Sequence, residues 1–346
     1  MEKKVYYGDY LQLDKILGAQ LPESRVNGNE AHDEMLFIVV HQAYELWFKQ
    51  ILHELSSVID VFSAPEVKDN SPALNTVVHR VSRVIEIFKV LVQQVNIIET
   101  MTPLDFLDFR DQLRPASGFQ SYQFKMTEAA LGLKFDQRHG QGYYLSQLRD
   151  EHKEIIKKIE DKSSLIELVN IWLARMPYFK DEYWVDYEAV TEKHEGFKFW
   201  GDYRKAYGQG LIEGEKENLK VFDKLFFSDE FNKERRLNAA ANRSALFIML
   251  YRDYPVLQMP YKLLNSLLEI DELMATWRYR HMNMVHRMIG RRVGTGGSSG
   301  KEYLKAAMDK HYIFSEIAEL TSFLMERKNL PHLPVQLESK LGFVSG

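Results

Sequence analysis

The chain has 346 residues, of which 45% are hydrophobic and 27% charged, a composition that excludes intrinsic disorder and suffices for one large domain or two ordinary ones. Lys and Arg number 45 against 49 Asp and Glu, and this net charge of -4 argues against nucleic acid or an anionic membrane as a bulk partner. The absence of cysteine excludes a disulfide framework, thiolate-bound zinc, iron–sulfur clusters, a cysteine nucleophile and thiolate-bound haem.

The first ten residues lack the apolar stretch of a secretory signal. The longest apolar run, residues 245–251, is far shorter than the roughly 20 residues that span a bilayer. We therefore expect a cytoplasmic protein that has no membrane partner.

Helical periodicity dominates the chain. Apolar residues step by three or four from Leu36 to Phe62 and again from Val77 to Ile98, which predicts two long helices. Further helices are predicted at about 103–113, 120–131, 145–160, 163–175, 209–227, 229–251, 257–290 and 301–327, with breaks at 63–72, 132–142, 176–201 and 294–300. Strand-like alternation is nearly absent, so the predicted fold class is all-α.

None of these breaks is a long linker, and no internal repeat is visible. Residues from about 132 to 228 are richer in charge and aromatic side chains than the sequence on either side. We expect a single domain over residues 1–346, in which this stretch is a smaller helical elaboration on a bundle built from the first and last thirds.

The first long helix carries the first candidate site. Asn29 is its expected N-cap, and acidic residues in its first turn suit the helix dipole. Phe37 and His41 are four residues apart and share a face, a pattern that an interior phenylalanine and histidine of the core explain equally well. His41 and Glu45 also resemble a metal pair, but no third ligand follows at a matching spacing.

Phe106 and Arg110 share a face of a short helix that Pro115 must end. The planar guanidinium of Arg110 is suited to grip a carboxylate through two oxygens. The alternative is a solvated network with the neighbouring acidic residues Asp105, Asp108 and Asp111, and spacing alone favours that network.

The last long helix contains His281 and His286, which are five residues apart and so lie about 140° apart around the helix. They cannot easily bind one metal together, whereas either could ligate iron singly, as a proximal haem ligand does. The glycine-rich run 294–300 fails as a phosphate loop, because Thr295 replaces a required glycine and Glu302 a required hydroxyl residue. It is either a loop that folds over a small polar ligand or a helix C-terminal turn that begins at Gly290.

Taken together, several blocks in this order closely resemble tryptophan 2,3-dioxygenase, from about residue 5 to 330 and most weakly between about 132 and 228. The blocks that carry the resemblance are 7–11 (YGDYL), 32–50, 108–110 (DFR), 115–121 (PASGFQS), 277–279 (WRY) and 294–300 (GTGGSSG). Members of this family use haem b and O2 to open the indole C2–C3 bond of L-tryptophan. The product is N-formyl-L-kynurenine, in the first step of the kynurenine pathway.

The resemblance also implies a role for individual residues. His281 matches the single proximal haem ligand, His41 the distal histidine that faces the indole nitrogen, and Arg110 the clamp on the substrate carboxylate. The other matching positions are Gly294 and Thr295 in the polar loop, Phe37, Phe106, Leu113 and Ser117 in the pocket wall, and Tyr7 and Tyr10 in an amino-terminal segment that completes a neighbouring subunit's site in a tetramer. His41 suits orientation of the indole better than proton removal, because an indole N–H is a very weak acid.

Three alternatives stay open on the sequence. A sister haem enzyme could insert one oxygen atom into an indole amino acid, and the mass of the product would separate it from a dioxygenase. A non-catalytic haem-binding module would show no tryptophan-induced change in its ferrous Soret band. A haem-free helical scaffold would be colourless when purified.

Overall fold

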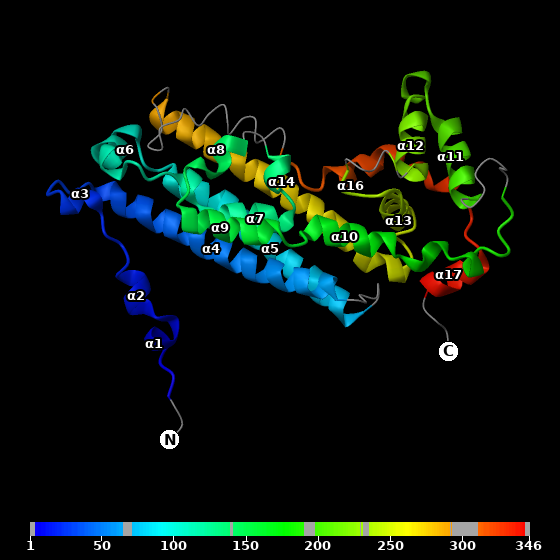
Figure 1. The fold of residues 1–346 in the computed structure, drawn as a ribbon, viewed down its shortest axis with the longest axis horizontal. Coiled ribbons are helices and arrows are strands. Elements are labelled where there is room, and N and C mark those ends of the chain that lie inside the picture. The colour runs from blue at the N-terminus through cyan, green and yellow to red at the C-terminus, as the bar shows by residue number, and fades with distance from the viewer. Residues whose placement is uncertain are drawn as a thin grey trace.

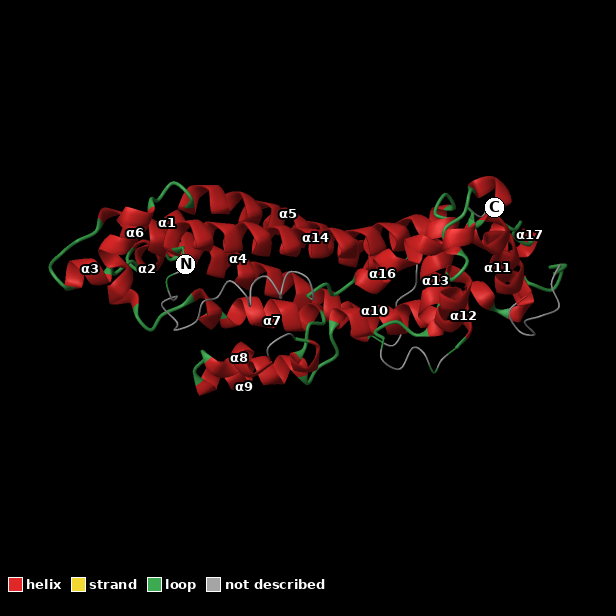
Figure 2. Ribbon diagram, turned by 90° about the horizontal axis from the view of Figure 1, so that it is seen from above, coloured by secondary structure: helices red, strands yellow, loops and turns green. Residues whose placement is uncertain are grey.

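The computed structural model of the chain describes residues 4–64, 71–138, 141–189, 198–228, 230, 235–290, 292 and 311–342. Throughout this part of the chain the regular elements are helices, with no strand among them (Figure 2). The predicted all-α class is therefore confirmed. None of the helices in these residues is long and apolar enough to cross a membrane.

Three long helices lie side by side and form the body of the molecule (Figures 1 and 2). They are α4 (His32–Ser63), α5 (Pro72–Ile98) and α14 (Pro255–Ile289). The apolar stripe predicted on α5 faces the core, and so does that on α4 with the exception of Trp47, which is 37% exposed while Tyr44 and Phe48 beside it are buried. Ile51 of α4 and Val81 of α5 are completely buried. The bundle thus follows from helical periodicity in the sequence.

Shorter helices cover one end and one side of this bundle. They are α6 (Pro103–Arg110), α7 (Tyr122–Leu131), α8 (Gln141–Ser146) and α9 (Asp150–Glu160). Thr102 and Asp105 cap α6 reciprocally, and after a 3-10 turn over Asp111–Leu113 the chain leaves the helical direction before Pro115, as predicted. α6 packs on both α4 and α14, whereas α7 packs on α4 and carries α9.

A cluster of helices packs around the opposite end of the long bundle (Figure 1). Its members are α10 (Leu165–Ala174), α11 (Lys198–Gly210), α12 (Asn218–Phe227), α13 (Ala239–Leu250), α16 (Ser315–Glu319) and α17 (Val335–Leu341). Large aromatic side chains such as Phe222, Phe247 and Phe323 fill their interior. They belong to the same continuous apolar core as the long helices.

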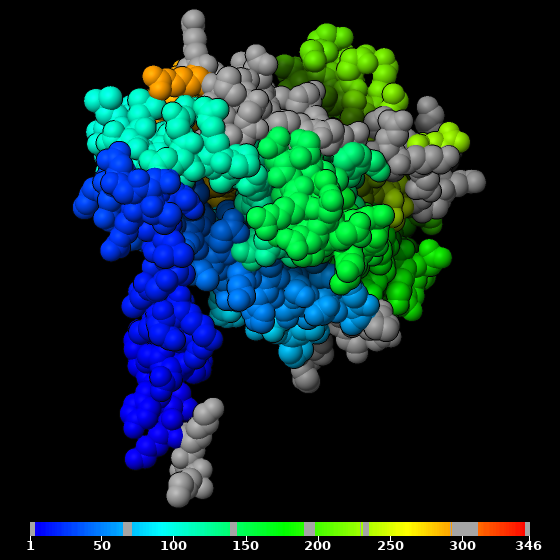
Figure 3. All heavy atoms as spheres, turned by 60° about the vertical axis from the view of Figure 1, so that its left-hand side comes forward, coloured from blue at the N-terminus to red at the C-terminus, as the bar shows by residue number. Residues whose placement is uncertain are grey.

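An amino-terminal arm extends away from the bundle (Figures 1 and 3). It contains α1 (Tyr7–Leu11) and α2 (Leu13–Leu17), which were not predicted, and it meets the bundle where Gln42 of α4 hydrogen-bonds Ala19 and Gln20. α3 (Glu23–Val26) follows, and the backbone N–H groups of Glu23 and Ser24 donate to the buried carboxylate of Glu34.

Several sequence predictions about element ends are wrong. Asn29 does not cap the first long helix, because α4 begins after Ala31, whose own N–H is held by the Ser24 hydroxyl. The helix predicted over 209–227 is two helices, α11 and α12, which meet around Gly210 and a 3-10 turn at Glu213–Glu215, so α11 occupies part of an expected break.

The helix predicted at 229–251 begins only at Ala239, where the Asn238 side chain accepts a hydrogen bond from the N–H of Ala241. Of the helix predicted at 301–327, residues 301–310 lie outside the described chain, and the rest is only the short α16 followed by a 3-10 turn. The N–H groups of Ile313 and Phe314 are taken by the Asp271 carboxylate, which removes them from any helix.

Candidate functional site

An aromatic wall forms where α4 meets α6. The ring of Phe37 lies 4.1 Å from that of His41, 5.7 Å from that of Phe106 and 5.6 Å from that of Phe109, centroid to centroid. Phe106 and Phe109 meet edge to face at 5.4 Å. The structure therefore brings together three predicted site residues, Phe37, His41 and Phe106, from two helices that are far apart in the sequence.

His41 is held in one tautomer. Its Nδ1 lies 2.7 Å from the carbonyl oxygen of Phe37, and because a carbonyl only accepts, Nδ1 must donate. Nε2 is then left with its lone pair. Burial lowers the pKa of His41, and the hydrogen bond to Phe37 offsets this only in part, so the ring is neutral at pH 7 and Nε2 is an acceptor.

The metal pair considered for His41 and Glu45 is not supported. The Glu45 carboxylate accepts a hydrogen bond of 2.8 Å from the Gln123 amide, which comes from α7. In the described chain, no three His, Asp or Glu side chains are arranged to hold a metal ion.

Arg110 is the last residue of α6, and its side chain is only 6% exposed. Asp105 caps the start of the same helix, Asp108 is exposed, and Asp111 approaches the guanidinium only to 3.8 Å. Of the solvated acidic network that spacing favoured, the structure shows only this ion pair with the exposed Asp111. The guanidinium itself is buried at the end of α6 that adjoins α4 and α14.

His281 lies on α14 with its ring parallel to the indole of Trp277, at an interplanar angle of 3° and a centroid distance of 5.2 Å. Burial, and to a smaller extent the nearby His41, lower the pKa of His281 to about 4. Its imidazole hydrogen-bonds no described residue, so a neutral nitrogen lone pair is available. His286, in contrast, is exposed.

A series of rings connects the two histidines across the bundle. The centroid distances are 6.4 Å from His41 to Tyr44, 6.0 Å from Tyr44 to Trp277 and 5.2 Å from Trp277 to His281. Tyr44 and Trp277 were not predicted as site residues. Their helical spacing was a usable signal, because Tyr44 is three residues after His41 and Trp277 four residues before His281.

The remaining predicted positions are placed differently. Leu113 is partly buried against the core in the 3-10 turn after α6, and the Ser117 hydroxyl accepts a hydrogen bond from the Phe119 N–H. Tyr7 and Tyr10 are 76% and 74% exposed on the amino-terminal arm. Gly294 and Thr295 lie outside the described residues.

Comparison with known proteins shows what this chain is similar to. A family model described as tryptophan 2,3-dioxygenase matches residues 1–324. Proteins named tryptophan 2,3-dioxygenase from Alteromonas mediterranea and Bdellovibrio bacteriovorus are 45% and 41% identical, each over 98% of this chain and over 97% and 98% of their own lengths. The rat protein of that name is 43% identical over 94% of this chain and 84% of its own length. The chain therefore belongs to the tryptophan 2,3-dioxygenase family.

Proposed function

We propose that this protein is a haem-dependent dioxygenase that inserts both atoms of O2 across the indole C2–C3 bond of L-tryptophan, giving N-formyl-L-kynurenine. Membership of the family supports the reaction. The structural observation that carries the proposal is the neutral, oriented His41 beside the Phe37 and Phe106 rings, which together suit an indole that donates one N–H.

The residues present are suited to haem. His281 offers a neutral imidazole nitrogen that no described residue occupies, and the buried Met284 and Met288 provide apolar surroundings on the same helix. We propose that His281 is the only protein ligand of the iron. Haem, when bound there, supplies the O2-binding and redox chemistry that side chains lack.

The remaining roles concern the substrate. Phe37, Phe106 and Leu113 would enclose the indole ring, and His41 Nε2 would accept its N–H and so fix which edge of the ring faces the oxygen. The Arg110 guanidinium would bind the carboxylate through two hydrogen bonds, because a buried carboxylate without a cation is costly. We assign polar contacts with the amino acid group to Ser117, Gly294 and Thr295.

The exposure of Tyr7 and Tyr10 is consistent with a substrate site to which a second chain contributes residues. We propose that the arm reaches the site of a neighbouring subunit in a homotetramer. Its large apolar side chains, exposed in the single chain, would then be covered.

The test is an assay of ferrous protein with L-tryptophan and O2, followed by the near-ultraviolet absorption of formylkynurenine and by product mass. The proposal expects a product heavier than tryptophan by two oxygen atoms. A product heavier by one oxygen atom would identify a mono-oxygenase. A ferrous Soret band that does not change when tryptophan is added would identify a non-catalytic haem protein.

Two substitutions test the histidine assignments. His281→Ala should abolish haem binding or turnover, whereas His286→Ala, at the exposed position, should leave both unchanged. His41→Ala should lower turnover without abolishing it, because orientation by the pocket walls persists. Complete loss of turnover in His41→Ala with haem and tryptophan still bound would mean that His41 does more than orient the indole.

A further inference from the structure

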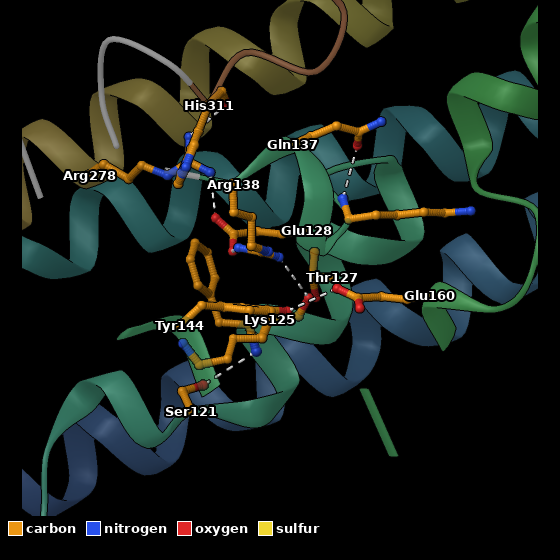
Figure 4. Close-up of polar contacts among 12 residues, drawn as sticks. Ser121, Lys125, Thr127, Glu128, Gln137, Arg138, Tyr144, Glu160, Arg278 and His311 are labelled. Carbon is orange, nitrogen blue, oxygen red and sulfur yellow. Dashed lines mark hydrogen bonds and ion pairs between the residues drawn. The ribbon is translucent and has the colours of Figure 1, made fainter. Parts of the chain in front are cut away.

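A buried charge cluster lies beside the candidate site and has no role in it so far. Glu128 of α7, Arg138 of the following loop and Arg278 of α14 are each no more than 5% exposed, and their charged groups point toward one another (Figure 4). One carboxylate oxygen of Glu128 accepts from Arg138 at 2.6 Å, and the other accepts from Arg278 at 2.5 Å. Glu128 thus joins α7 to α14.

The other branch of the Arg278 guanidinium donates to the carbonyl oxygen of His311 at 3.2 Å. Two helical turns before Arg278 on α14, the Asp271 carboxylate accepts hydrogen bonds from the N–H groups of Ile313 and Phe314 at 3.0 and 2.5 Å. The same side of α14 therefore holds both α7 and the chain at 311–314, and Arg278 is the residue that contacts both.

Two cations of this region lie against the ring of Tyr144. The guanidinium carbon of Arg138 lies 3.7 Å from the ring centroid of Tyr144, and the ammonium of the buried Lys125 lies 4.7 Å from it. Burial alone would raise the pKa of Glu128, but Arg138 and Arg278 lower it to about 2, so the carboxylate is charged. Without that charge, the guanidinium groups of Arg138 and Arg278 would both face an uncharged group.

Arg278 is three residues before His281, which is about 4.5 Å along the helix axis. Because both side chains leave the same helical turn, a rotation of α14 that moves Arg278 also turns the His281 ring. A guanidinium held by a carboxylate on one side and a carbonyl on the other resists such a rotation, since both hydrogen bonds are directional.

We propose that Glu128 is a positioning residue that fixes, through Arg278, the rotational setting of α14 and with it the direction of the His281 imidazole. This inference rests on the proposed role of His281 as the haem ligand. Groups behind a metal ligand commonly tune affinity or activity about 10- to 100-fold, and here the tuning acts through a helix.

The test compares the haem-loaded Glu128→Gln variant with the wild type by resonance Raman spectroscopy of the ferrous iron–histidine stretch and by the haem midpoint potential. Glutamine keeps the size but is uncharged and presents an N–H to one arginine, so both ion pairs are lost and one of the two hydrogen bonds must break. We expect haem to stay bound, the iron–histidine band to shift or broaden, and kcat to fall about 10- to 100-fold with little change in KM.

Glu54→Gln is the matched control, because Glu54 is also buried, at 3% exposed, but the side chains that it binds in the described chain are Arg83 of α5 and Gln50 of α4, neither of them a residue of α14. It should lower stability without moving the band. Arg278→Lys is the second variant and is used if Glu128→Gln does not fold. One ammonium group cannot bind both the Glu128 carboxylate and the His311 carbonyl, so the iron–histidine band should shift in this variant too.

A Glu128→Gln or Arg278→Lys protein with lower thermal stability but a wild-type band and potential would overturn the positioning role. That result leaves the proposed function intact. The proposed function fails separately if the wild type has no iron–histidine band, or if His281→Ala keeps it.

Discussion

At the scale of single residues, the structure shows environments for His41 and Arg110 that their sequence spacing alone does not predict. A histidine at helical spacing from a phenylalanine is usually core filling, yet His41 has one nitrogen committed to the Phe37 carbonyl and the other left as an acceptor. An arginine among three aspartates is usually solvated, yet the Arg110 guanidinium is buried. In both cases the environment decides the chemistry.

Arg110→Ala should weaken use of L-tryptophan, because the substrate carboxylate would be buried without a cation. The expected loss in kcat/KM corresponds to about 2–5 kcal/mol, or roughly 30-fold to a few thousand-fold. Steady-state kinetics with L-tryptophan and with tryptamine, which lacks the carboxylate, check this. Arg114→Ala, at an exposed position, is the control; equal losses for both substrates in Arg110→Ala would contradict a carboxylate clamp.

Lys125 gives a prediction about pH. Burial lowers its pKa to about 8 in the folded protein, from 10.5 when it is unperturbed, so between these values the unfolded chain binds more protons and stability rises with pH. The charged form therefore costs stability at pH 7, by no more than roughly 3 kcal/mol.

Lys125→Met should be more stable than the wild type at pH 7 and should lose the rise between pH 8 and 10.5. Urea unfolding at pH 7.0 and 9.5 measures both effects, with Lys153→Met, whose side chain is 37% exposed, as the control. A Met variant that is less stable at pH 7 would show that the contact of Lys125 with the Tyr144 ring outweighs the cost of burial.

At the scale of elements, two helix ends depend on glycine for different reasons. Gly290 ends α14 at φ +58°, and no described atom lies within 4 Å of where a Cβ would be. Gly132 ends α7 at φ +137°, and a Cβ there would lie 2.4 Å from a methyl carbon of Ile166. At position 290 only the backbone conformation disfavours a side chain, whereas at position 132 a side chain would also clash with Ile166.

Gly290→Ala should therefore cost about 1–3 kcal/mol of unfolding free energy, and Gly132→Ala clearly more, because overpacking adds to backbone strain. Denaturant unfolding of the two variants gives the comparison. Gly118→Ala, where φ is not positive and no described atom is near, is the neutral control. Equal losses at positions 132 and 290 would mean that Ile166 moves aside freely.

At the scale of the whole molecule, the amino-terminal arm stands apart from the continuous core. Its residues Tyr7, Tyr10 and Leu17 are at least 72% exposed. An arm of this kind contributes little to the stability of its own chain, but it presents apolar surface that a partner can cover.

Deletion of residues 1–18 should leave the unfolding free energy within about 0.5 kcal/mol of the wild type, but should reduce turnover and the assembly mass. Analytical ultracentrifugation and the tryptophan assay measure these. Mixed assemblies of arm-deleted chains with Arg110→Ala chains should regain activity, because an intact site then receives a partner's arm. No recovery in assemblies shown to be mixed would count against exchange of the arm.

Much of the fold was predictable because it depends on local rules. The stripes of α4 and α5 and the break before Pro72 follow from helical periodicity and proline geometry. One of the errors falls where a distant side chain takes backbone groups, as Asp271 does at Ile313 and Phe314. Sequence spacing does not contain that information.

The sequence by itself determined the helical class, the family and the residue types at the candidate site, since periodicity and motif order are properties of the chain. Only the tertiary structure decided that Phe37 meets Phe106, that Arg110 is buried, and that Glu128 joins α7 to Arg278 three residues before His281. The physical reason is that burial and hydrogen-bond partners, which set charge and tautomer, come from helices that meet only when the bundle forms.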